Sequence, residues 1–245
     1  MHGIEIRVSL AYHGSMSQTF VISLGGSIVA PDKPDTAFLR EFSRTIREHI
    51  EANESRFILV VGGGGPARAY QTAYRELVEQ PEKNEQDWIG IAATRLNAQL
   101  VRGLFHDLAP QPVVVDPSAV ESFQGSVLIA AGWKPGFSTD FDAVILAERF
   151  SGDTIINLSN IEKVYTADPK KDPKAEPLDR VSWEEFRRIV GEEWNPGSNF
   201  PFDPVATKRA ATLGLRVIAA AGRDLQNLKK ILSEEPFEGS QIGPE

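Results

Sequence analysis

The chain has 245 residues, 41% of them hydrophobic, and its 34 acidic and 26 basic side chains give a formal net charge of -8 at pH 7. This length allows one compact α/β domain or two closely joined lobes, and the negative charge disfavours nucleic-acid polymers and anionic membranes as partners. The absence of Cys excludes disulfides, thiolate metal ligands and thiol catalysis, and the four His form no metal-binding pattern. Any metal is therefore expected to be Mg²⁺, held by carboxylates and substrate phosphates.

Residues 1–17 stand before the first strong strand signal. Their apolar residues alternate, but no basic segment leads into a long apolar stretch, so the sequence does not predict a signal peptide. Because Met16 lies just before the first strand, we interpret residues 1–17 as an extension, with an extra edge strand as the alternative. The chain has no run of about 18 apolar residues, the length that would predict a membrane span.

From residue 20 to residue 150, buried-strand patterns alternate with helical periodicity, and glycines stand between them. Proline suits a first helical turn, so the helix after four consecutive glycines is expected to begin near Pro66. The long helix that follows is expected to turn Ile89, Leu96, Leu100 and Leu104 toward the core. In chain order, we predict a strand at 20–24, a helix at 35–52, a strand at 56–61, a helix from Pro66, a helix at 86–106, strands at 112–115 and 127–131, and a helix at 140–150.

Beyond Gly152 the pattern changes, which suggests a second lobe at 153–245 joined to a first lobe at 18–152 within one continuous domain. A capping box at 182–185 and the pair Asp203-Pro204 predict two helix starts. In chain order, we predict a strand at 154–158, an exposed loop or hairpin at 166–177, a short helix after Ser182, a helix through Leu213, a strand at 216–221, a helix at 224–232 and a short strand at 241–242. The whole pattern predicts a mostly parallel sheet between two helical layers, a three-layer α/β sandwich.

Two glycine segments follow predicted parallel strands. Glycine lets the backbone approach an anion closely, and a helix N-terminus behind it offers unpaired N–H donors. Gly25-Gly26-Ser27 alone is more readily explained as a tight turn, whereas the four glycines at 62–65 favour a close backbone approach. Arg68, one turn into the next helix, could hold the same phosphate or could be a solvated surface side chain. Neither segment matches the Gly-rich patterns of common mononucleotide or dinucleotide folds.

Three further polar groups are candidates for ligand contacts. Asp87 could accept ribose hydroxyls or could complement a helix dipole, and its spacing does not separate the two. Ser138-Thr139-Asp140 is more simply a helix N-cap cluster. Tyr165 and Asp168 could border an adenine or a ribose, or could form a plain turn. We expect the four Trp in the core or at an interface, except Trp133, which interrupts a glycine-containing loop.

Taken in order, these segments resemble the amino-acid kinase superfamily and, within it, the archaeal uridylate kinases. The resemblance covers roughly residues 20–244 and is carried by Ser23-Leu-Gly-Gly-Ser27, the glycines at 62–65 with Arg68, Asp87-Trp-Ile-Gly-Ile91, Thr94-Arg-Leu-Asn97, the segments 132–140 and 160–169, and Asp203-Pro-Val-Ala206. It implies ATP-dependent phosphorylation of UMP in pyrimidine nucleotide biosynthesis, with ATP and Mg²⁺. It also implies a cytoplasmic location and a homo-oligomer, usually a hexamer.

By the same resemblance, each segment contributes residues to one of two nucleotide sites. The UMP site is implied to contain Gly63, Gly64, Arg68, Asp87, Gly132, Ser138 and Thr139. The ATP site is implied to contain Ser23, Asn160, Tyr165 and Asp168. The catalytic centre is implied to contain Gly25, Gly26, Ser27, Asp140 and Asp203.

Ser23 departs from the superfamily pattern. Many members have a Lys at this position, which neutralises charge on the phosphoryl group, so another cation must compensate here. Lys134 is our candidate because it lies in the loop beside the implied acceptor site. Two alternatives to a UMP kinase stay open: a kinase of another small phosphate acceptor, and a non-catalytic nucleotide- or oxyanion-binding member similar to the molybdenum storage proteins.

Overall fold

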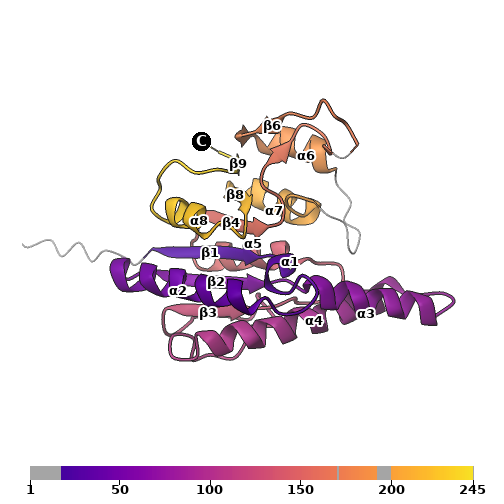
Figure 1. Ribbon diagram of the computed structural model, residues 1–245, viewed down its shortest axis with the longest axis horizontal. Helices are drawn as coiled ribbons and strands as arrows, with labels where there is room; N and C mark the ends of the chain where they lie inside the picture. Colours follow the sequence, from indigo (N-terminus) through magenta and orange to yellow (C-terminus); the bar gives the residue numbers. More distant parts are fainter. Residues whose placement is uncertain (1–17, 170, 192–199, 245) are drawn as a thin grey trace, which may run out of the picture.

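The computed structural model describes residues 18–169, 171–191 and 200–244, so the expectations for residues 1–17 and for Trp194 concern residues outside the described ranges. Strands and helices alternate along the described chain (Figure 1). The strands are β1 (Thr19–Leu24), β2 (Arg56–Val61), β3 (Val127–Ala130), β4 (Thr154–Ser159), β5 (Val164–Tyr165), β6 (Pro177–Leu178), β7 (Arg180–Val181), β8 (Arg216–Ala221) and β9 (Ser240–Ile242). The helices are α1 (Gly26–Val29), α2 (Thr36–Asn53), α3 (Gly64–Leu77), α4 (Lys83–Leu104), α5 (Thr139–Arg149), α6 (Trp183–Val190), α7 (Pro204–Leu213) and α8 (Leu225–Leu232).

The large sheet has the strand order β3-β2-β1-β4-β8-β9-β7. Its first five strands run parallel, β9 pairs antiparallel with β8, and β7 pairs parallel with β9, which confirms the mostly parallel sheet. Because β1 pairs with both β2 and β4, the sheet continues from the first half of the chain into the second. Figure 1 shows β1, in indigo, next to β4, in orange, where the two halves meet.

The predicted strand at 112–115 is wrong. Only a single bridge between Val114 and Ala130 forms there among the described residues. Pro112 and Pro117 flank the apolar run, and a proline has no N–H to contribute to a ladder. The run therefore touches the edge of β3 at one point instead of extending the sheet.

Side chains of the central strands alternate between two hydrophobic cores. In β1, Phe20, Ile22 and Leu24 belong to the core shared with α2, α4 and α8, whereas Val21 belongs to the core shared with α5, α6 and α7. Helices thus cover both faces of the sheet, and the predicted three-layer sandwich is confirmed.

The face that α4 turns to the core differs from the predicted one. Leu96 is 69% exposed and Leu100 is 39% exposed, so the expectation that both point inward is wrong. Small and polar side chains occupy much of the inner face, because it packs against loops whose peptide groups need hydrogen-bond partners. The buried residues of α4 are Asp87, Ile91, Thr94, Asn97, Ala98 and Val101.

Local signals in the second half of the chain are confirmed. Ser182 caps α6 by accepting the Glu185 N–H, and Asp203 caps α7 by accepting the Ala206 N–H, with Pro204 in the first turn. The polar stretch after residue 165 connects β5 and β6, which pair antiparallel as a hairpin.

The carboxyl ends of β1, β2, β3 and β4 meet at one edge of the sheet because these strands are parallel. The segments that leave them begin at residues 25, 62, 131 and 160, so groups far apart in the sequence come together there. Open α/β sheets bind ligands at this edge. None of the described helices is both long enough and apolar enough to cross a membrane.

Candidate active site

The two glycine segments at this edge pack directly against each other. A Cβ on Gly26 would lie 2.0 Å from the Gly64 nitrogen, and a Cβ on Gly62 would lie 2.4 Å from the Gly26 nitrogen. Gly64 has a φ of +66°, and a Cβ there would lie 2.2 Å from the Gly26 oxygen. Only glycine fits such contacts. The glycines are therefore explained by loop packing, which also brings the peptide groups of both loops to one place.

α3 begins inside the four-glycine segment, at Gly64, and its N-cap residue Gly63 has no side chain to bond the first N–H groups. Asn97 holds the carbonyl side of the loop, since its Nδ2 donates to the oxygens of Gly62 at 2.9 Å and Gly63 at 3.1 Å. An uncapped helix N-terminus favours an anion through its N–H donors and the helix dipole.

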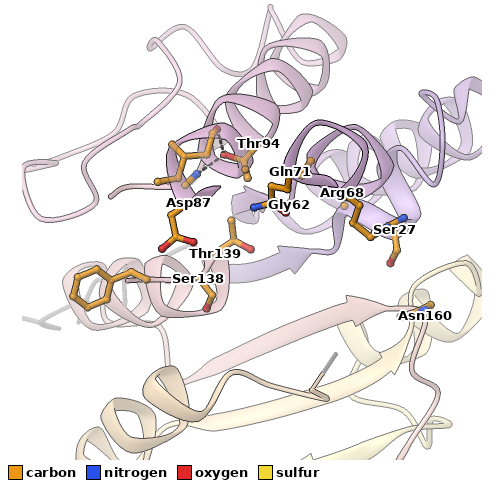
Figure 2. Close-up of a pocket in the computed structure, with 17 residues that line it drawn as sticks. Ser27, Gly62, Arg68, Gln71, Asp87, Thr94, Ser138, Thr139 and Asn160 are labelled. Atoms are coloured by element: carbon orange, nitrogen blue, oxygen red, sulfur yellow. Dashed lines mark hydrogen bonds between the residues drawn. The ribbon is translucent and has the colours of Figure 1, made fainter. Parts of the chain in front are cut away.

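A cavity of about 490 Å³ opens where the glycine loops meet α4 and the segment after β3 (Figure 2). Arg68 is the cationic side chain among its described lining residues, and its guanidinium donates to the Pro31 oxygen at 3.0 Å. Figure 2 shows Arg68 and Ser27 at one side of the cavity and Asp87 at the other. The cavity is lined by Gly26, Ser27, Gly62, Gly63, Gly64, Ala67, Arg68, Gln71, Asp87, Gly90, Ile91, Thr94, Gly132, Phe137, Ser138, Thr139 and Asn160.

The segment after β3 forms one wall of this cavity and is hydrogen-bonded to α4. The Gly132 N–H donates to Thr94 Oγ1 at 2.8 Å, and the Gly136 N–H donates to Asp87 Oδ2 at 2.8 Å. Asp87 is 8% exposed, and burial raises its pKa. Ser138 is the N-cap of α5, which confirms its capping role, and it lines the cavity as well.

Ser23, Asp140 and Asp203 form a hydrogen-bonded group that lines neither this cavity nor the second one described below. Ser23 Oγ donates to Asp140 Oδ1 at 2.8 Å, and the Asp203 N–H donates to Asp140 Oδ2 at 3.1 Å. Burial, followed by the nearby charge of Asp203, raises the pKa of Asp140 to about 6. Burial also raises the pKa of Asp203, which is 4% exposed. Ser23 thus orients Asp140 and does not lie at the wall where an ATP contact was expected.

A second cavity, of about 740 Å³, lies beside the β5–β6 hairpin. Tyr165 and Asp168, both expected at an ATP site, line it. Asn160 lines both cavities, so they adjoin at the carboxyl end of β4. Two ligands bound in them would therefore face each other across Asn160.

Lys134 and Gly25 line neither cavity. The Lys134 ammonium lies 3.7 Å from the ring centroid of Trp133 and 5.3 Å from that of Phe137, a cation–π arrangement. The Gly25 N–H donates to the Leu158 oxygen at 2.8 Å and ties the end of β1 to β4. The structure therefore places the expected substitute cation on an aromatic surface.

Several residues that build the site have no individual role predicted from the sequence. Thr94 and Asn97 hold the two loops, and Gln71 lines the cavity while its amide donates to the Gln86 oxygen at 2.9 Å. Thr94 and Asn97 share a helix face with Ile91 at spacings of three residues. The spacing of these two polar residues from the apolar Ile91 was the signal in the sequence that could have placed them on the buried face. Gln71 carried no such signal.

The fold and these two cavities define a class of α/β protein that is suited to hold a phosphate-bearing ligand beside a second ligand at the carboxyl edge of a parallel sheet. One cavity offers glycine backbone, a helix N-terminus and an arginine. The other offers an aromatic ring and carboxylates.

Comparison with known proteins agrees with this class. Residues 18–219 match the Amino acid kinase family. The uridylate kinase of Hyperthermus butylicus is 35% identical over 224 residues, which are 91% of this chain and 96% of that protein. The crystal structure of the uridylate kinase from Archaeoglobus fulgidus has a TM-score of 0.78 at 34% identity, covering 92% of this chain and 100% of the other. The UMP kinase of Bacillus anthracis shares the fold, with a TM-score of 0.71 at 19% identity over 92% and 96% of the two chains.

This chain belongs to the amino acid kinase family. The resemblance that the ordered motifs indicated is thereby confirmed.

Proposed function

We propose that this protein transfers the γ-phosphoryl group of ATP to UMP, giving UDP and ADP. The observation that carries the proposal is the pair of adjoining cavities, with Arg68 and the α3 N-terminus in the first and Tyr165 and Asp168 in the second. An arginine fork and helix N–H donors suit a phosphate acceptor better than an amino acid. Relatives that align with more than nine-tenths of this chain carry the name uridylate kinase, which supports UMP as the acceptor.

In the proposed reaction, the residues act by position and charge. UMP lies in the first cavity with its phosphate at Arg68, Gly63 and Gly64 and its ribose at Asp87. An acceptor phosphate oxygen then attacks the γ-phosphorus in line, and ADP leaves. The chain need not supply a base, because the acceptor phosphate is already largely ionised near pH 7.

Mg²⁺ fits this site as an ion carried mainly by the nucleotide. The described residues contain no group of three or more His, Cys, Asp or Glu that could hold a metal alone. Asp140 is partly exposed, and burial, followed by the nearby charge of Asp203, raises its pKa. A divalent cation would relieve the repulsion between the two carboxylates. Asp140 would approach the ion while phosphates and water supply its other oxygen ligands. When bound, the ion neutralises charge on the phosphates.

A cation must also take the place of the Lys that Ser23 replaces. We keep Lys134 as the proposed candidate, although reaching the phosphates would require it to leave the Trp133 ring. If Lys134→Ala leaves kcat within a few-fold of wild type, the candidate is wrong, and Arg68 is then the cation that remains among the described residues that line the first cavity.

We further propose that residues 18–152 form the acceptor lobe and residues 153–245 the ATP lobe of one domain, acting in the cytoplasm in pyrimidine nucleotide biosynthesis. A homo-oligomer, by resemblance a hexamer, is supported by large apolar side chains that α3 and α4 expose. They are Tyr70, Leu77, Trp88, Leu96 and Leu100. Apolar surface of this kind favours association.

A coupled assay of ADP release tests the function, with UMP, CMP, AMP, acetylglutamate and carbamate as acceptors. We expect turnover with UMP above all others. Arg68→Gln should raise the KM for UMP while Arg40→Gln, on the exposed surface of α2, should not. Preference for another phosphate acceptor would replace UMP, and tight ATP binding without any turnover would favour a binding protein instead.

A further inference from the structure

The peptide groups on both sides of Trp133 are held by a carboxyl and a guanidinium group from two different helices. Asp142, on α5, accepts the Trp133 N–H at 3.2 Å through Oδ2. Arg95, on α4, donates through one terminal nitrogen to the Trp133 oxygen at 3.0 Å and through Nε toward the Gly132 oxygen at 3.4 Å. The loop that leaves β3 is thus fixed at its first residues from two directions.

Asp142 is an unusual residue to find in a core. It is fully buried at 0% exposure, and its second oxygen, Oδ1, has no hydrogen-bond partner among the residues that the structure describes. Burial raises its pKa to about 8; the charges of Asp140 and Asp116 add to this effect, while the Trp133 N–H and Arg95 oppose it. A buried carboxyl that is only half satisfied destabilises a folded protein. Its presence therefore calls for a role other than stability.

The end of the loop that Asp142 and Arg95 hold leads directly into the wall of the first cavity. Gly132, which directly precedes Trp133, lines the cavity. Phe137, four residues after Trp133, also lines it, and its ring centroid lies 5.5 Å from that of Trp133. Between them, the Gly136 N–H donates to Asp87 Oδ2 at 2.8 Å. A shift at Trp133 would move this whole wall and would loosen the bond to Asp87.

We propose that Asp142 and Arg95 are positioning residues for the acceptor: by holding the two peptide groups of Trp133, they set the place of the wall against which the acceptor's nucleoside lies. Neither side chain lines the cavity, so both act through the loop. The inference rests on the proposed acceptor site in this cavity. The second cavity shares no wall with the loop, so ATP binding should not depend on the grip.

Kinetics of three variants test this inference. Asp142→Asn keeps an oxygen that can accept the Trp133 N–H, whereas Asp142→Ala removes it. Loss of one such hydrogen bond should raise the KM for UMP about tenfold in Asp142→Ala, with the KM for ATP within about twofold of wild type. Asp142→Asn should restore the KM for UMP to within about twofold of wild type. Equal changes in both KM values, no change in either, or an Asn variant as impaired as Ala would overturn the proposal.

Arg95→Lys is a second test that remains available if the Asp142→Ala variant fails to fold. Lysine keeps the charge but cannot reach both carbonyl oxygens with a planar fork, so the KM for UMP should again rise alone. Hydrogen exchange gives a readout without turnover: amides of residues 132–138 should exchange faster in Asp142→Ala and Arg95→Lys but not in Asp142→Asn. If wild type fails to phosphorylate UMP, the proposed function falls, and the exchange data still decide whether these residues hold the loop. Unchanged exchange in both Asp142→Ala and Arg95→Lys would refute the inference that these side chains hold the loop.

Discussion

Replacing Asp142 by Asn should stabilise the protein by an amount that grows with pH. Burial raises the pKa of this carboxyl to about 8, whereas the pKa of an Asp in an unfolded chain is ~3.9. Between these values the folded state binds a proton that the unfolded state does not, so the free energy of unfolding of the wild type falls by about 1.4 kcal/mol for each pH unit. Asn carries no such proton. The advantage of Asp142→Asn should therefore grow by roughly 3 kcal/mol from pH 5 to pH 7.

Urea unfolding of both proteins at pH 5, 6 and 7 measures this difference. Asp140 titrates in both proteins, so its contribution largely cancels. A matched control is Asp107→Asn, because two hydrogen bonds from Arg47 hold the pKa of Asp107 well below its usual range. Asp107 is then ionised in both states from pH 5 to pH 7, and its variant should differ from wild type by the same amount throughout. If the difference in free energy of unfolding between Asp142→Asn and wild type is also the same at pH 5, 6 and 7, Asp142 is charged in the folded protein and the reasoning is refuted.

Three further outcomes are expected. Gly64→Ala should lower the free energy of unfolding by at least about 2 kcal/mol, because φ is positive there and the added Cβ would meet backbone atoms. In the same urea titration, Gly103→Ala should raise the free energy of unfolding by about 0.5 kcal/mol, because the added Cβ would have no described atom within 4 Å. Ser23→Ala removes a hydrogen bond that lowers the pKa of Asp140, so the acidic limb of the kcat/KM profile should move to higher pH, and an unmoved limb would count against this role. Leu96→Glu should reduce the mass measured by light scattering without changing the circular dichroism; an unchanged mass would remove Leu96 from the interface.

The fold was predictable because its signals are local. The strand at 56–61 contains an unbroken apolar run at 57–61, and Ser182 and Asp203 indicate helix starts through residues only three positions away. Such signals need no knowledge of the rest of the chain. The order of strands and helices then implied the layers.

The inner face of α4 was not predictable in the same way. Leu96 and Leu100 form an apolar stripe, but the stripe faces outward, and Thr94 and Asn97 point inward because loops from residues 62 and 132 bring peptide groups to them. Asp142 presents the same difficulty, since its bond to Trp133 depends on how α5 packs beneath a loop. Polar burial of this kind is decided by partners that are distant in the sequence.

The backbone contact between the glycine loops also limits how this protein can be redesigned. Gly26 and Gly64 meet through peptide atoms alone, so the distance between the ends of β1 and β2 follows from the spacing of the sheet and cannot be adjusted by choosing other side chains. Substitutions at these glycines will therefore destabilise the fold and will not alter the selectivity for the acceptor. A change of acceptor has to be made on α3, on α4 or in the 132–139 segment, where side chains form the wall.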